Sequence, residues 1–116
     1  MLKKVYITIF LITLNVIGFA QKVITPEWLT IEDGLSQSFV SSIMQDKEGF
    51  IWMGTKNGLN RYDGRQFENF AVDNKKTYAL KNDNILSMHD DDGFGLFGTY
   101  EGLFLFQKST KRFYNI

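Results

Sequence analysis

One pattern of residues occurs twice in this chain, 44 positions apart. The first copy occupies residues 49–63 and the second occupies residues 93–107. The identical positions are Gly49, Phe50, Gly54, Thr55, Gly58 and Leu59, which recur as Gly93, Phe94, Gly98, Thr99, Gly102 and Leu103. An internal repeat of this length is typical of folds in which each unit buries its apolar face against its neighbours. We therefore expect an array of two similar units.

The residue types within each copy predict short strands joined by tight turns. In the first copy, β-branched and aromatic residues concentrate in four stretches, at residues 40–46, 50–55, 59–62 and 67–70. Asn57-Gly58 and Asp63-Gly64, which favour hairpin turns, separate the last three. The second copy repeats this plan, with strands expected from Ile85, Phe94, Leu103 and Phe113. Each unit is thus predicted to be a four-stranded antiparallel meander.

A repeated four-stranded meander of about 40–50 residues is the signature of a β-propeller blade. The sequence predicts an all-β fold, a partial β-propeller with blade 1 at residues 37–70 and blade 2 at residues 85–116. Residues 71–84 are expected to connect the blades. Residues 21–36 are expected to hold an outer strand, at Trp28 to Ile31, and a lead-in. Such an outer strand commonly completes the last blade of a closed ring and latches it.

Residues 1–20 have the pattern of a secretory signal peptide. Lys3 and Lys4 form a short basic region, an apolar run follows at residues 5–19, and small residues precede a cleavage point between Ala20 and Gln21. An uncleaved membrane anchor is the alternative, but the run is shorter than the roughly 20 residues that span a bilayer. The mature chain is expected to be exported, to the periplasm or the extracytoplasmic side of the inner membrane.

The composition of the mature part excludes two classes of protein. Removing Lys3 and Lys4 leaves 11 basic and 13 acidic residues, a net charge of −2. Binding to a nucleic acid would require a basic face, and the sequence shows none. Cysteine is absent, so an exported fold of this chain depends on packing and not on disulfides. A nucleic-acid-binding module and a small disulfide-stapled scaffold are both disfavoured.

No set of residues has the spacing of a catalytic, cofactor or metal site. Asp90, Asp91 and Asp92 precede Gly93, but they lack the alternating ligands and the distant glutamate of a calcium loop, so we interpret them as a solvated hairpin turn. His89 is the single histidine and has no cysteine or second histidine with which to share a metal. We expect no catalytic residue, no cofactor and no metal ligand.

The shared pattern itself is interpreted as structural. Aromatic residues dominate packing between such sheets, so Trp52, Tyr62 and Phe67 are expected in the core between blades, with a stacking platform for sugars as the alternative. Arg61 and Asp63 are expected to form a cross-strand pair. The glycines are explained by turns and close backbone approach. The motif positions are Trp52, Gly54, Thr55, Gly58, Leu59, Tyr62, Gly98, Thr99, Gly102, Leu103 and Phe106.

The first copy and its lead-in carry a specific resemblance. Asp33-Gly34-Leu35-Ser36, then Val40-x-x-Ile43-x-x-Asp46, then the run from Gly49 to Gly64, closely resemble the start of a two-component regulator propeller. In that family such repeats form the extracytoplasmic sensor of hybrid histidine kinases, often as two propellers followed by a Y-shaped all-β domain, a transmembrane helix and cytoplasmic signalling domains. The resemblance covers essentially the whole mature chain. The second copy is the weaker match, because Leu96 replaces the central Trp52.

The resemblance implies a non-catalytic sensor segment. A full receptor of this family would detect a glycan-like or other small ligand outside the cytoplasmic membrane and pass the signal through a phosphorelay to transcription. Its implied partners are that ligand, further blades and a second receptor in a dimer; the ligand-binding residues are not assigned. The alternative is a secreted propeller-type binding or adhesion protein. Because kinase, ATP-binding and receiver sequences are absent, we expect a truncated product of a receptor gene, with a genuine short protein that assembles blades from several chains as the other possibility.

Overall fold

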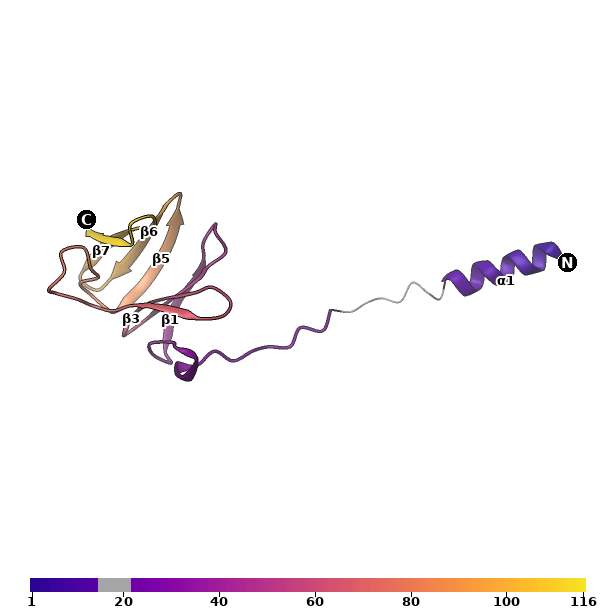
Figure 1. Ribbon diagram of the computed structural model, residues 1–116, viewed down its shortest axis with the longest axis horizontal. Helices are drawn as coiled ribbons and strands as arrows, with labels where there is room; N and C mark the ends of the chain where they lie inside the picture. Colours follow the sequence, from indigo (N-terminus) through magenta and orange to yellow (C-terminus); the bar gives the residue numbers. More distant parts are fainter. Residues whose placement is uncertain (15–21) are drawn as a thin grey trace.

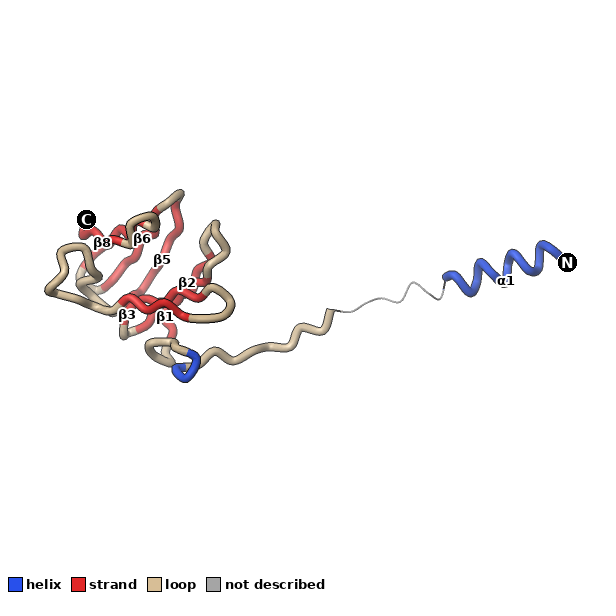
Figure 2. The backbone as a smooth tube through the Cα atoms, viewed as in Figure 1, coloured by secondary structure: helices blue, strands red, loops and turns tan. Residues whose placement is uncertain are grey.

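The computed structural model describes residues 1–14 and 22–116 (Figure 1). The predicted cleavage point between Ala20 and Gln21 lies outside the described residues. Helix α1 (Leu2–Leu14) comes first, and the short 3₁₀ helix η1 (Ile31–Asp33) precedes the strands (Figure 2). Within the described ranges, no helix combines the length and the apolar character needed to span a bilayer.

The strands of the described part form two four-stranded antiparallel sheets, each a meander in sequence order. Sheet 1 consists of β1 (Val40–Gln45), β2 (Ile51–Thr55), β3 (Gly58–Tyr62) and β4 (Phe67–Phe70). Sheet 2 consists of β5 (Ile85–Asp91), β6 (Phe94–Thr99), β7 (Gly102–Gln107) and β8 (Arg112–Asn115). The predicted all-β class with two blade-like meanders is confirmed, and the predicted strand ends are right to within one residue.

The two sheets share one register, so the sequence repeat is also a repeat of pairing. Gly54 lies opposite Leu59 across β2 and β3, and Gly98 lies opposite Leu103 across β6 and β7. Each first strand also has a register shift near its start. A residue of sheet 1 therefore has a structural counterpart in sheet 2. The counterpart is the residue that holds the same place in the strand pairing of sheet 2.

The core lies between the two sheets. Trp52 is 1% exposed, stacks on Phe70, and has its ring centroid 5.6 Å from that of Phe97 and 5.4 Å from that of Phe106. Further buried members are Leu59, Leu80, Ile85, Phe104 and Phe113. Burial of this aromatic and aliphatic surface is the main source of stability that the two blades share.

The connector between the blades contributes to this core. Leu80 is fully buried in it, although the connector is mostly polar. The backbone N–H of Asp73 donates to the carbonyl of Leu80 at 3.1 Å, and the carbonyl of Tyr78 accepts from the N–H of Phe113 at 2.8 Å. Residues 71–84 are thus held against β8 and bring one leucine into the space between the sheets.

The lead-in differs from the prediction. Residues 22–30 form no strand, and Trp28 is 88% exposed. Thr30 instead caps η1: its side chain accepts from the N–H of Glu32 at 3.2 Å, and the Asp33 carboxylate accepts from the N–H of Thr30 at 2.7 Å. A strand needs a neighbouring strand for its backbone hydrogen bonds, and none of the described strands pairs here, so local capping prevails. The strand predicted at Trp28 to Ile31 is wrong for this structure, and a latch in a larger ring stays a prediction.

Candidate functional site

A buried carboxylate organises the start of the first repeat. Asp46 directly follows β1, and its Oδ1 accepts from the N–H of Phe50 at 2.9 Å. Its Oδ2 accepts from Trp52 Nε1 at 2.7 Å, and the residue is 5% exposed. A carboxylate out of water is costly unless its oxygens are bonded. Asp46 therefore fixes the turn between β1 and β2 and the Trp52 ring together.

A lysine from the other blade reaches the same place. Lys108 lies in the turn after β7, and its Nζ is 3.8 Å from Asp46 Oδ2, 2.7 Å from Glu48 Oε2 and 2.6 Å from Asp90 Oδ1. Its side chain is 13% exposed. We refer to Asp46, Glu48, Asp90 and Lys108 as the inter-blade clamp. It joins three carboxyl groups of two blades around one ammonium.

Within the inter-blade clamp, Lys108 and Asp90 hold each other in the charged form. Burial alone would lower the pKa of Lys108, but hydrogen bonds to Asp90 and Glu48, with the charge of Asp46, outweigh it and the pKa is raised. Burial would raise the pKa of Asp90, but hydrogen bonds from the Lys108 ammonium and from the N–H of Lys47 outweigh it, so this pKa is lowered. Each partner thus stabilises the ionised form of the other.

A groove of about 500 Å³ opens beside the clamp. Phe50 of blade 1 and Phe94 of blade 2 supply apolar walls, and Gln107 supplies an amide. The Arg61 guanidinium lies 4.5 Å from the centre of the Phe50 ring and pairs with Glu68 across β3 and β4. Because both blades line it, this inter-blade groove exists only where two blades are docked.

The pair expected between Arg61 and Asp63 is wrong. Arg61 pairs with Glu68, and the Asp63 carboxylate accepts from the N–H groups of Arg65 and Gln66, each at 2.8 Å. The side chain of Asp63 thus bonds the backbone of its own turn, as aspartate at the start of a turn commonly does.

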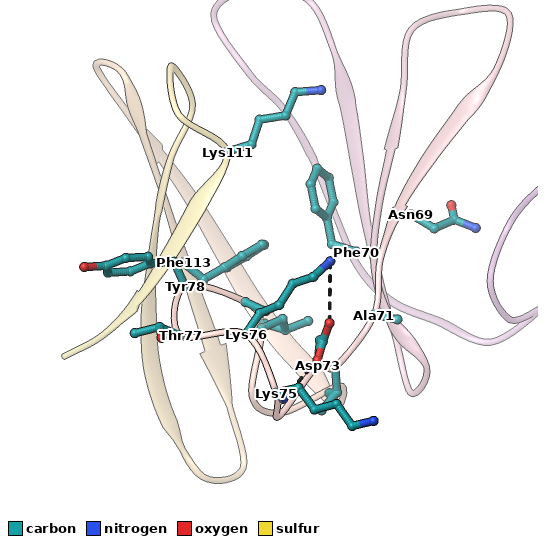
Figure 3. Close-up of a pocket in the computed structure, with 13 residues that line it drawn as sticks. Asn69, Phe70, Ala71, Asp73, Lys75, Lys76, Thr77, Tyr78, Lys111 and Phe113 are labelled. Carbon is teal, nitrogen blue, oxygen red and sulfur yellow. Dashed lines mark hydrogen bonds and ion pairs between the residues drawn. The ribbon is translucent and has the colours of Figure 1, made fainter.

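A second groove, of about 760 Å³, lies at the outer rim between β4, the connector and β8 (Figure 3). Its basic side chains are Lys75, Lys76 and Lys111. Figure 3 shows Lys76 paired with Asp73, with Nζ and Oδ2 3.6 Å apart, and Lys111 Nζ lies 2.6 Å from Glu68 Oε1. The rim groove is therefore polar, with its charges largely matched.

The three consecutive aspartates do not converge. Asp90 turns to Lys108, whereas Asp92 pairs with Lys47. His89 is exposed on β5. Among residues 1–14 and 22–116, as far as they are described, no group of three or more histidine, cysteine or acidic side chains is placed to hold a metal ion.

The shared motif builds the same hairpin in both sheets. The hydroxyl of Thr55 donates to the carbonyl of Gly58 at 3.0 Å, and the hydroxyl of Thr99 donates to that of Gly102 at 3.1 Å. Gly58 has φ of +99°, and a Cβ there would lie 2.4 Å from the carbonyl oxygen of Phe70. Glycine is therefore required at this position by both conformation and space.

The remaining motif positions divide between two faces. Trp52, Leu59 and Phe106 lie in the core between the sheets. Tyr62 contacts Phe67, with ring centroids 4.8 Å apart, and the register places both on the opposite face of sheet 1. Sequence reasoning identified these residues but missed Lys108, which lies in a polar turn without any local signal.

A family model matches one stretch of the chain. The stretch includes β1, Asp46, β2 and the hairpin turn after β2. The model described as "Two component regulator propeller" matches residues 34–57. This stretch of the chain is similar to a two component regulator propeller repeat. The resemblance seen in the sequence is thereby confirmed, and the matched repeat is a propeller unit and not a kinase domain.

Two known proteins are similar to this chain. The crystal structure of the extracellular domain of the hybrid two component system BT3049 from B. thetaiotaomicron is similar with a TM-score of 0.70 and 30% identity, over 77% of this chain and 13% of that chain. Histidine kinase P4 of Formosa agariphila is 58% identical over 36 residues, 31% of this chain and 3% of that protein. The chain thus corresponds to a small part of each relative.

Proposed function

We propose that this chain supplies blades to the extracytoplasmic sensor propeller of a hybrid two-component system. One observation carries the proposal: the similarity to the extracellular domain of such a system extends over 77% of the chain, well beyond the matched repeat. In the whole receptor, binding of a ligand outside the cytoplasmic membrane would control a kinase and, through a phosphorelay, transcription. The contribution of this chain is structural and ligand-facing, and it is not catalytic.

The proposed ligand is a glycan-like small molecule. The inter-blade groove offers what such a ligand requires, aromatic walls at Phe50 and Phe94 with the Gln107 amide and charged groups at the edge. Because both blades line this groove, a ligand there would depend on how the two blades are docked. That dependence is a route by which binding can alter the geometry of a propeller.

The experiment has two readouts. The first is the reading frame of the transcript beyond the codon for Ile116, which we expect to continue into further Trp-x-Gly-Thr repeats and a histidine kinase. The second is an alkaline phosphatase fusion after Ile116, which we expect to be active, and inactive once residues 1–20 are deleted. A stop codon followed by an unrelated gene would contradict the sensor proposal and favour a secreted binding protein. An inactive fusion would contradict export.

A further inference from the structure

Four dipeptides of this chain have the composition that rearranges without an enzyme. An asparagine or an aspartate precedes a glycine at Asp33-Gly34, Asn57-Gly58, Asp63-Gly64 and Asp92-Gly93. In such a pair the glycine nitrogen can attack the side-chain carbonyl carbon, because glycine has no Cβ that hinders the approach. The reaction needs a glycine N–H without a hydrogen-bond partner and a side chain that is free to turn toward it. The four sites differ in both respects.

Asn57-Gly58 is closed to this reaction in the folded chain. The Gly58 N–H donates to the carbonyl of Asp83 at 2.9 Å, and Gly58 is buried. The side-chain amide of Asn57 donates to the carbonyl of Ser36 at 3.3 Å. Both reacting groups are therefore held by other parts of the chain, and the reaction has to wait for local opening.

Asp33-Gly34 is closed in the same way. The Gly34 N–H donates to the carbonyl of Ile31 at 3.2 Å. The carboxylate of Asp33 accepts from the N–H and the hydroxyl of Thr30, at 2.7 and 3.1 Å. The cap of η1 thus occupies the nitrogen and the carboxylate together.

Asp63-Gly64 is protected through its carboxylate. Its Oδ1 accepts from the N–H groups of Arg65 and Gln66, each at 2.8 Å. Hydrogen bonds from Gln66 and Arg65 lower the pKa of Asp63. Ring closure at an aspartate proceeds from the protonated carboxyl group, so a carboxylate that is held ionised reacts slowly.

Asp92-Gly93, in the turn between β5 and β6, has none of these restraints. Within residues 1–14 and 22–116, the Gly93 N–H donates to no group, and a Cβ placed on Gly93 would meet nothing within 4 Å. The only side-chain partner of the Asp92 carboxylate in that part of the chain is Lys47, and the two side chains are 85% and 63% exposed. Surface ion pairs of this kind are weak and open readily.

We propose that Asp92-Gly93 is a modification site at which the folded chain converts aspartate to isoaspartate, while the fold protects the other three dipeptides. The Gly93 nitrogen bonds to Cγ of Asp92, the C–OH bond of the protonated carboxyl group breaks, and the hydroxyl leaves with the N–H proton as water. Water then opens the ring at the α-carbonyl, so that the main chain runs through Cγ. Atoms and charge balance with water alone. The inference is independent of the sensor proposal, because it concerns the chemistry of one turn.

The modification would act on the inter-blade clamp. Asp90 accepts from the N–H of Lys47 at 3.0 Å and lies 2.6 Å from Lys108 Nζ. Isoaspartate lengthens the main chain by one carbon at residue 92 and moves the carboxylate that pairs with Lys47. Because Lys47 and Asp90 are bonded, this change is expected to loosen the contact between the blades.

Peptide mapping after prolonged incubation tests the site. The purified chain is kept in neutral buffer below its unfolding transition, and a second sample is kept in urea. Isoaspartate is located by mass spectrometry and by labelling with an isoaspartate methyltransferase. We expect it at residue 92 in the folded sample and at none of the other three sites. In urea we expect all four sites to react, with Asn57 first, because an amide closes the ring faster than a carboxyl group.

Asp92→Glu is the matched control, since it keeps the charge but would have to close a larger, slower ring. We expect no isoaspartate at residue 92 in this variant. We also expect a lower urea midpoint after incubation for wild type and an unchanged midpoint for Asp92→Glu. Isoaspartate at residue 57 before residue 92 in the folded sample would overturn the proposal. So would a folded residue 92 that stays intact while it reacts in urea. An unchanged midpoint in a sample that carries isoaspartate at residue 92 would overturn the effect on the clamp.

Discussion

Trp52 and Trp28 show how differently two residues of one type are used. Trp52 packs in an aromatic cluster, and its Nε1 donates to a buried carboxylate. Trp28 lies in the exposed lead-in, without a strand to belong to. The consequence at the residue scale is that only one of the two tryptophans determines the stability of the blades.

Trp52→Ala is expected to lower the free energy of unfolding by about 3–5 kcal/mol, because it removes a large buried ring and leaves a cavity. It also leaves Asp46 Oδ2 without its indole partner. Trp28→Ala is expected to change the free energy by less than about 0.5 kcal/mol. Urea unfolding followed by circular dichroism measures both. Equal costs for the two variants would show that the aromatic cluster does not hold the sheets together.

At the scale of elements, one close approach between the two blades is at a glycine. A Cβ on Gly54 would lie 2.7 Å from Ile85 Cγ2, as well as 2.5 Å from Ser42 Oγ. At the counterpart position, a Cβ on Gly98 would lie 2.4 Å from Ser87 Oγ but meets no side chain of another sheet. The missing side chain at Gly54 thus allows the two blades to pack together. At Gly98 it only allows neighbouring strands of one sheet to pair.

We expect Gly54→Ala to destabilise the chain by about 1–3 kcal/mol, because buried Ile85 cannot move without opening the core. Gly98→Ala should cost less, since a serine hydroxyl can rotate away. Thermal unfolding of the two variants side by side gives the comparison. If Gly98→Ala proves the more costly, the close approach of β2 to β5 is not the limiting contact.

The strands were predictable because their signals are local. Asn57-Gly58 and Asp63-Gly64 fix two hairpins, and the alternation between them sets the register. The lead-in strand was predicted wrongly, because its pattern says nothing of a partner strand. Lys108 and Asp46 are far apart in sequence, and nothing near either residue indicates that they meet.

On the scale of the whole molecule, the inter-blade clamp makes stability depend on pH. Asp90 has a lowered pKa, so its contribution is complete above the ordinary aspartate pKa, about 3.9, and is lost as the pH falls through the lowered value. Lys108 has a raised pKa, so its contribution is complete below about 10.4 and is lost as the pH rises through the raised value.

Both losses should lower the urea concentration at the midpoint of unfolding. We expect this concentration to fall below about pH 4 and to fall again above about pH 10.4. Asp90→Asn is expected to reduce the acid step, because the group that titrates there is gone. The matched control is Asp92→Asn, an exposed residue in the turn just after β5, which should leave the acid step as it is. An acid step of full size in Asp90→Asn would show that the clamp does not link the blades.

The sequence by itself determined the strands, the two meanders and the kind of blade they form, because hairpin turns, alternation and the repeat act between residues close in the chain. The motif around Trp52 also carries the resemblance to the two component regulator propeller that the family model matches at residues 34–57. Only the tertiary structure decided that Lys108 crosses to Asp46, that Leu80 enters the core, and that the lead-in caps a turn instead of forming a strand. The first two features depend on groups brought together from distant parts of the chain, whose burial and charge are set only once the sheets have docked. The third depends on whether a partner strand lies beside the lead-in, which the local pattern does not indicate.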